Sequence, residues 1–163
     1  MTNDEMKKIM EWIFLNDEKS IHAFVEENNN LINDVTPYGT MLSVACRKGK
    51  YEIVKYLIEK GCDVNLGGGL EASPLVEASL RGYSEIVELL LANGAELDVS
   101  SFEANPLFAA ISNEHDEIAI KLIDHGIDIT AKYDIGEIEN CDALEYARQY
   151  GLTEVYEYLK SRI

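Results

Sequence analysis

No hydrophobic run near the start of the sequence is long enough to cross a membrane or to form the core of a signal peptide. The longest such run there is Trp12-Ile13-Phe14-Leu15, which Glu11 precedes and Asn16-Asp17 follows. A transmembrane helix needs about 20 apolar residues, and the apolar core of a signal peptide needs about 7 to 15. We therefore expect that the chain is neither exported nor inserted into a membrane, and that it is cytoplasmic.

Cysteine is scarce as well. The three cysteines, Cys46, Cys62 and Cys141, are widely spaced, and no two of them form a Cys-x-x-Cys pair. This spacing predicts neither a zinc cluster nor a disulfide framework, and it is typical of a reducing compartment. We expect Cys46 and Cys62 to be buried as small apolar side chains, and Cys141 to be more exposed.

Basic residues are few for a chain of this length. The sequence has 14 lysines and arginines against 30 aspartates and glutamates, a net charge of −16. Residues 36–67 carry five basic and three acidic side chains, whereas residues 68–130 carry two basic and twelve acidic ones. Phosphate binding needs clustered lysine and arginine, so we expect no nucleic-acid partner. The excess of carboxylates favours solubility, and the alternative is an acidic face for a basic partner.

The residues that carry chemistry in enzymes are not arranged for it here. His22, His115 and His125 have no carboxylate at a spacing that suggests a catalytic triad or a metal site. Gly67-Gly68-Gly69 lacks the following Lys and Ser or Thr of a phosphate-binding loop. We expect no enzyme activity, no catalytic residue, no cofactor and no bound metal.

An internal repeat dominates what is present. Met41–Ala45 matches Pro74–Ala78 at an offset of 33, and the same offset relates Gly49 to Gly82. Further steps of 32 and then 37 residues bring Pro106-Leu107 and then Leu144 into register, and a step of 32 backwards from Ile53 reaches Ile21. Self-similarity at a fixed period indicates a repeat architecture, and five units tile the chain.

Each unit has the sequence features of two short helices. Ser73-Pro74 supplies an N-cap and a proline at the first helical position, where its missing N–H costs nothing. Gly82 then interrupts the first helix, and Asn93-Gly94 is a typical left-handed end for the second. One unit alone cannot bury both apolar stripes, so neighbouring units must stack.

The glycine-centred segments Gly61–Asn65, Gly94–Asp98 and Gly126–Thr130 complete the pattern, which resembles the ankyrin repeat family. The resemblance implies an all-α solenoid of stacked helix-turn-helix units with short β-hairpin fingers. Two features depart from the family consensus: its opening histidine and, in two units, its proline. The histidine is replaced by Ser43, Val76, Phe108 and Glu145, and the proline by Met41 and Ala143. The hydrogen bond between threonine and histidine that the family uses is therefore expected to be absent.

We predict a single ankyrin-repeat domain over 1–163. Residues 1–35 form an N-terminal capping unit with charged side chains, residues 36–67, 68–99 and 100–131 form full repeats, and residues 132–163 form a C-terminal capping unit. A longer finger precedes this last unit, with 16 residues between Gly126 and Ala143 against 12 and 11 in the two preceding linkers. Insertions in repeat arrays are often found on the binding face.

The resemblance also implies where a partner binds, on a concave face of fingers and first-helix ends. Aromatic residues and arginine at these places are typical of interaction hot spots. The residues predicted for this face are Tyr38, Arg47, Lys48, Leu70, Leu80, Arg81, Phe102, Ser112, Asn113, Tyr133, Ile135 and Tyr150.

Two functions fit these features. The first is a protein-interaction module without catalytic activity, and the second is a dedicated inhibitor, such as an immunity protein that occludes a cognate basic bacterial toxin. In both cases we expect the partner to be another protein, neither nucleic acid nor membrane, and the chain alone to be a monomer. A basic surface on that partner is one alternative, and it suits the inhibitor best.

Overall fold

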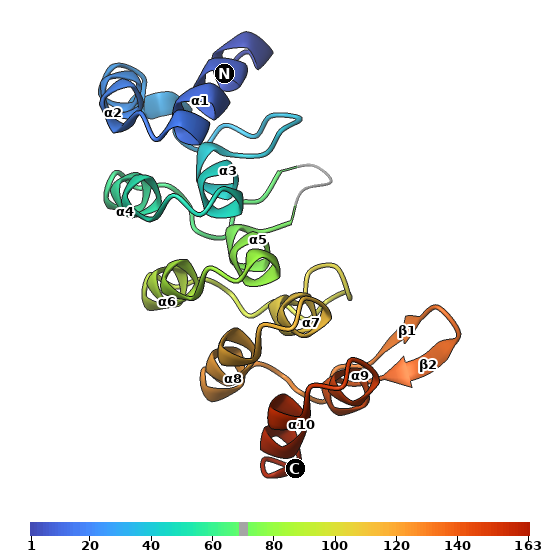
Figure 1. Cartoon of the computed structure of the whole chain (residues 1–163). Helices are drawn as coiled ribbons and strands as arrows, with labels where there is room; N and C mark the ends of the chain where they lie inside the picture. The colour runs from blue at the N-terminus through green and yellow to red at the C-terminus, as the bar shows by residue number, and fades with distance from the viewer. Residues whose placement is uncertain (69–71) are drawn as a thin grey trace. The chain divides into compact units, whose positions relative to one another are not determined.

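The computed structural model describes residues 1–68 and 72–163 and is mostly helical, with helices packed in pairs (Figure 1). The α-helices in this part of the chain are α1 (Asn3–Leu15), α2 (Glu18–Glu27), α3 (Met41–Arg47), α4 (Tyr51–Glu59), α5 (Pro74–Arg81), α6 (Ser84–Ala92), α7 (Pro106–Ser112), α8 (Asp116–Asp124), α9 (Ala143–Gln149) and α10 (Thr153–Lys160). A short 3-10 helix, η1, covers Asn29–Leu31, and the strands are β1 (Tyr133–Ile135) and β2 (Ile138–Cys141). These paired helices confirm the predicted fold class.

The first helices begin where the sequence places a capping residue. The Asn105 side chain accepts hydrogen bonds from the amides of Leu107 at 2.9 Å and Phe108 at 3.4 Å. At the start of α3, the Thr40 side chain accepts from the Ser43 amide at 3.1 Å, and the Ser43 hydroxyl accepts from the Thr40 amide at 3.0 Å. Ser43, in the place of the family's histidine, thus closes a reciprocal cap of the kind that stabilises helix starts.

Glycine ends the first helix of the α5–α6 pair for a steric reason. Gly82 directly follows α5 and has φ +80°, a conformation that side chains with a Cβ rarely adopt. A Cβ at this position would also lie 2.7 Å from the His115 ring. Both the turn and the close approach of His115 therefore require glycine. Gly94, after α6, has φ +86°, which confirms the predicted left-handed end of that helix.

The contacts divide the chain into two compact units, Met1–Ala78 with Glu85–Glu96, and Ser79–Ser84 with Leu97–Ile163. In the first unit α1 packs on α2 and α3, α3 packs on α4, and α2 packs on α4. Its core contains Met6, Ile9 and Ile13 of α1 and Ile53 and Leu57 of α4, all fully buried. These residues lie three or four positions apart, so each helix buries a single face.

Asparagine side chains join successive loops of the first unit. Asn33 accepts a hydrogen bond from the Asp63 amide at 2.8 Å and donates one to the Gly61 carbonyl at 3.3 Å. One repeat later, Asn65 accepts from the Glu96 amide at 2.8 Å and donates to the Gly94 carbonyl at 3.2 Å. A side-chain amide can both donate and accept, so one residue satisfies both backbone groups.

In the second unit α7 packs on α8 and α9, and α10 packs on α8 and α9. The long finger forms an antiparallel hairpin in which Tyr133 pairs with Cys141 and Ile135 with Ile138. Figure 1 shows this hairpin extending away from α9 and α10. Within the described residues it is the finger that forms a two-stranded sheet, whereas the first finger has a single bridge between Thr36 and Gly39.

The start of the chain is less polar than expected for a cap. Phe14 and Leu15, at the end of α1, are 66% and 64% exposed. The helix nevertheless starts with a complete capping box, in which Thr2 and Glu5 bond to each other's backbone amides. The Thr-x-x-Glu spacing of residues 2–5 is a usual sequence signature of such a box. In the described part of the chain, no helix is long and apolar enough to span a membrane.

Shortening a buried side chain of the stacked layer should destabilise the fold severely. Leu107 is a fully buried side chain of α7, so Leu107→Ala leaves a cavity in the core beside this helix. The substitution should lower the free energy of unfolding by about 2–5 kcal/mol, as measured by urea denaturation. Leu15→Ala is the control, because Leu15 is mostly exposed and its loss should cost less than about 0.5 kcal/mol. Equal effects of the two substitutions would contradict the repeat register.

Candidate protein-interaction surface

In the first unit, the predicted arginine is turned toward the protein. The Arg47 guanidinium donates to the Tyr38 carbonyl at 3.1 Å, and its Nη1 lies 3.6 Å from Oε1 of the buried Glu77. Arg47 thus connects the first finger to the end of α3 and to α5. Lys48 is exposed and Tyr38 is half-buried, so these two keep a surface available for contact. Leu70 lies outside the described residues.

The end of α5 presents a freer cation. Arg81, the last residue of the helix, is exposed, and no ion pair of its guanidinium occurs within residues 1–68 and 72–163. Leu80 beside it is half-buried. A basic side chain in the last helical turn interacts favourably with the negative end of the helix dipole. Arg81 therefore remains available for an external carboxylate, unlike Arg47.

Phe102, on the finger before α7, belongs to an aromatic cluster of the second unit. Its ring lies edge-on to Phe108 at 5.6 Å, to Tyr133 at 6.2 Å and to Tyr146 at 5.8 Å between ring centroids. Phe108 and Tyr146 stack at 4.7 Å, and burial raises the pKa of the Tyr146 hydroxyl. Edge-on and offset contacts of this kind stabilise aromatic pairs. Phe102 is consequently half-buried rather than a free side chain at the fingertip.

Tyr133 fixes the long finger to the unit. Its hydroxyl donates to the Val99 carbonyl at 2.7 Å and accepts from the Asn105 side chain at 3.1 Å. Asn105 is fully buried and also caps α7. The finger and the start of α7 therefore share one hydrogen-bond network, which holds Phe102 and Tyr133 in place.

Tyr150 follows α9 and exposes 43% of its surface. Its hydroxyl accepts a hydrogen bond from the Tyr146 hydroxyl at 3.3 Å, and the two rings lie 4.8 Å apart. Tyr150 thus extends the aromatic cluster to the protein surface. At the end of α7, Asn113 is exposed and Ser112 is half-buried, and both side chains donate to the Ala109 carbonyl.

The hairpin carries acidic side chains toward solvent. Asp134, Glu137 and Glu139 are exposed, whereas Ile135 and Ile138 are half-buried. An exposed carboxylate gains little from local pairing but contributes to the field that an approaching partner experiences. Of the predicted residues in the second unit, Phe102, Tyr133 and Tyr150 are brought together by the aromatic cluster, and the hairpin carries Ile135 beside them.

The expectation that Cys141 is more exposed is wrong. Cys141 is 1% exposed at the end of β2, and its Sγ lies 3.6 Å from the Asp142 carbonyl oxygen. Burial raises the pKa of the Cys141 thiol, raises that of Cys46, and raises that of Cys62 to about 12. Thiolate is the nucleophilic form of cysteine, so none of these thiols is set up for reaction at neutral pH.

Two of the three histidines pack against neighbouring residues. The His115 ring lies against Gly82, and the His22 ring stacks on Tyr56 at 3.7 Å. His125 is exposed, and its Nδ1 lies 2.8 Å from the Lys121 carbonyl oxygen. Among the residues that the structure describes, no three His, Cys, Asp or Glu side chains are grouped as metal ligands are.

Repeated helix pairs with fingers between them define a helical repeat protein. The family profile described as "Ankyrin repeats (3 copies)" matches residues 9–101 and 75–162. The chain therefore belongs to the ankyrin repeat family, and its repeats span most of the sequence. Arrays of this family generally act as protein–protein interaction modules and are typically not catalytic.

The chain resembles parts of longer proteins. It is 35% identical to an ankyrin repeat protein of Rickettsia felis, over 61% of this chain and 48% of that protein. It is 33% identical to the ankyrin repeat and KH domain-containing protein mask-1 of Caenorhabditis elegans, over 86% of this chain and 6% of that protein. It is also 34% identical to the palmitoyltransferase AKR1 of Lachancea kluyveri, over 63% and 14%. The chain thus spans less than half the length of these relatives.

All three thiols should be unreactive in the folded protein. Because they are buried and their pKa values are raised, Ellman's reagent should release almost no colour from the native protein at pH 8, and three equivalents after unfolding in urea. Rapid reaction of one equivalent without denaturant would show that Cys141 is accessible.

Removing the Tyr133 hydroxyl should destabilise the second unit. Tyr133→Phe leaves the Val99 carbonyl and the buried Asn105 amide without this partner, so unfolding should become easier by about 1–3 kcal/mol in urea denaturation. Tyr156→Phe is the control and should change the free energy of unfolding by less than about 0.5 kcal/mol, because no hydrogen bond of that hydroxyl occurs in the described part. If Tyr133→Phe left the free energy of unfolding unchanged, the hydrogen-bond network would not contribute to stability.

Proposed function

We propose that this chain is a protein-interaction module without catalytic activity, and that its partner contacts the fingers and the ends of the first helices. The observation that carries the proposal is the aromatic cluster of the second unit, which reaches the surface at Tyr150 and at the edge of Phe102. In the first unit, Tyr38 and Lys48 would contact the partner.

The cluster suits binding because its side chains are already held in place. Phe102 and Tyr133 are fixed by ring contacts and by the Asn105 network, so a partner would lose little entropy in ordering them. Aromatic residues and arginine contribute most of the energy at protein interfaces. Arg81, exposed and without an ion pair in the described part, would add a charge-assisted hydrogen bond to a partner carboxylate.

Charge supports a basic partner. The exposed carboxylates of Asp134, Glu137 and Glu139 lie on the hairpin next to the aromatic cluster, and the whole chain carries −16. Charges at the rim of an interface mainly accelerate association and lose this effect in salt. We therefore assign the aromatic residues and Arg81 to holding the partner, and the hairpin carboxylates to attracting it.

The same acidity favours a second candidate, a dedicated inhibitor that occludes a basic bacterial toxin. Such a protein would bind one cognate partner tightly, whereas a general adaptor binds several partners weakly. A neighbouring gene for a basic toxin, and protection of cells that express it, would favour the inhibitor.

Photo-crosslinking tests the surface. With p-benzoylphenylalanine at Tyr150 or at Arg81, the chain should form a discrete covalent adduct in its native cells, whereas the same group at Lys160, which is exposed on α10, should not. With the partner purified from that adduct, Tyr150→Ala and Arg81→Ala should each weaken binding by about 1–2 kcal/mol in calorimetry. Phe102→Ala should weaken it too, but it also removes ring contacts and so requires a stability measurement alongside.

The proposal fails if Lys160 gives the adduct and Tyr150 does not, or if Tyr150→Ala and Arg81→Ala bind the purified partner as the parent chain does. Neutralising Asp134, Glu137 and Glu139 together serves as the test of the charge assignment. It should slow association at low salt and leave dissociation almost unchanged.

A further inference from the structure

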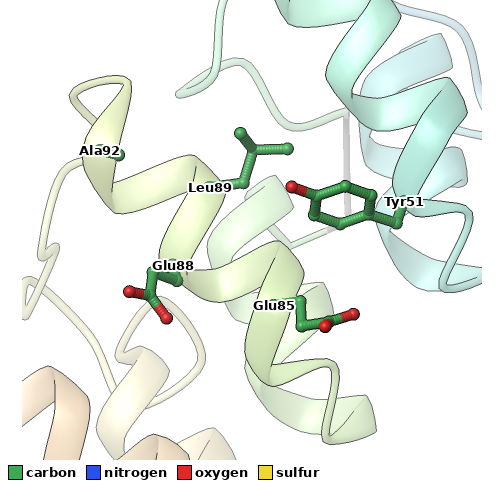
Figure 2. A pocket seen from close by; sticks show the side chains of 5 residues that line it. All are labelled: Tyr51, Glu85, Glu88, Leu89 and Ala92. Carbon is green, nitrogen blue, oxygen red and sulfur yellow. The ribbon is translucent and has the colours of Figure 1, made fainter.

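A groove of about 320 Å³ lies between α4 and α6, within the first unit, on the side of the second helices (Figure 2). Tyr51, Glu85, Glu88, Leu89 and Ala92 line it. Figure 2 shows the Tyr51 ring projecting from α4 toward α6, with its hydroxyl toward Leu89, while the Glu88 carboxylate points away from the ring. The groove thus has an aromatic wall, an aliphatic wall and the Glu85 carboxylate at its edge.

The neighbouring pair of second helices, α2 and α4, combines similar groups with a cation of the chain itself. The Tyr56 hydroxyl donates to Oε1 of Glu26 at 3.3 Å. Lys60 forms an ion pair with Glu26, and its Nζ lies 5.5 Å from the centroid of the Tyr56 ring. The hydrogen bond from Lys60 lowers the pKa of Glu26. Tyr56, Glu26 and Lys60 therefore each contact the other two, an arrangement that we call a closed triad.

A second closed triad occurs between α8 and α10 in the other unit. The Tyr158 hydroxyl donates to Oδ1 of Asp124 at 2.5 Å, and Arg162 donates to the same oxygen at 2.6 Å. The Arg162 guanidinium carbon lies 4.8 Å from the centroid of the Tyr158 ring. A cation over an aromatic face and beside a carboxylate is attracted by both. In both triads the cation follows the tyrosine by four residues, just beyond the end of the helix that carries the tyrosine.

Between α4 and α6, the described part of the chain provides no such cation. In residues 1–68 and 72–163 no basic group lies over the Tyr51 ring, and none forms an ion pair with Glu85. Lys55, which follows Tyr51 by four residues, instead lines the neighbouring groove with Glu52 and Glu59. The aromatic ring and the carboxylate are both in place, and Leu89 and Ala92 add an apolar wall.

We propose that this groove receives an arginine side chain from a partner protein. The guanidinium would lie over the Tyr51 ring and donate to the Glu85 carboxylate, and the arginine methylenes would lie along Leu89 and Ala92. A net charge of −16 favours a basic occupant over a neutral or acidic one. The contact is separate from the fingers and first-helix ends, so it stands whether or not those bind a partner.

Nuclear magnetic resonance titration with short peptides tests the groove. The probe is acetyl-Gly-Arg-Gly-amide, and the matched neutral probe replaces arginine by citrulline, which keeps the shape and removes the charge. The arginine peptide should bind in the millimolar range and shift the signals of Tyr51, Leu89 and Ala92 first. The citrulline peptide should bind at least about 10-fold more weakly, which corresponds to about 1.4 kcal/mol.

Three variants separate a built site from general attraction to an acidic protein. Tyr51→Leu and Glu85→Gln should each weaken binding of the arginine peptide at least about 5-fold, whereas Glu154→Gln, which removes the same charge from an exposed position on α10, should leave it unchanged. The spectrum of each free variant shows whether it is folded. Equal binding of the two peptides, equal effects of Glu85→Gln and Glu154→Gln, or shifts spread over the whole surface would overturn the proposal.

Discussion

The helices of this chain are too short to be stable alone. The described α-helices have between seven and thirteen residues, whereas an isolated helix shorter than about 12–15 residues is marginal in water. Each helix therefore persists because its apolar face is buried on another helix, as Ile53 and Leu57 of α4 and Leu107 of α7 are. Caps, glycine turns and loop hydrogen bonds all serve to hold such faces together.

Polar contacts then fix the spacing of one loop to the next. Asn33 and Asn65 each satisfy one amide and one carbonyl of the following loop. At the next equivalent position the chain has Asp98, whose side chain accepts from the Ser100 amide and has no hydrogen to give to a carbonyl. The hydrogen bonds from Ser100 lower the pKa of Asp98, because they favour its charged form. Asp98 therefore makes a local turn contact, where Asn33 and Asn65 bond to the following loop.

The sequence allowed the fold to be predicted because its repeated features are local. Ser73-Pro74, Gly82 and Gly94 each act on the backbone within a few residues, and the structure confirms the helix boundaries they indicate. The candidate surface was harder to predict. The inward turn of Arg47 and the packing of Phe102 depend on residues about 30 positions away, such as Glu77 and Tyr133. No periodicity encodes which way such side chains turn.

The same reason explains the burial of Cys141 and the groove beside Tyr51. Cys141 lies at a hairpin end whose register with Tyr133 fixes which side chains face inward. Tyr51 and Tyr56 lie on the same helix five residues apart, and only the packed structure shows that Lys60 covers one and leaves the other open. Sequence spacing alone does not distinguish the two tyrosines, because a lysine follows each of them by four residues.

The contact between Gly82 and His115 bears on how such arrays change over evolutionary time. The histidine ring occupies the space that a side chain at position 82 would need, and the two residues belong to successive repeats. Duplicating or exchanging one repeat would therefore separate Gly82 from His115 and place each of them next to a residue that it does not fit. Repeats with similar sequences are therefore not interchangeable, because each is sterically matched to its neighbour. Substitutions at positions 82 and 115 should occur together.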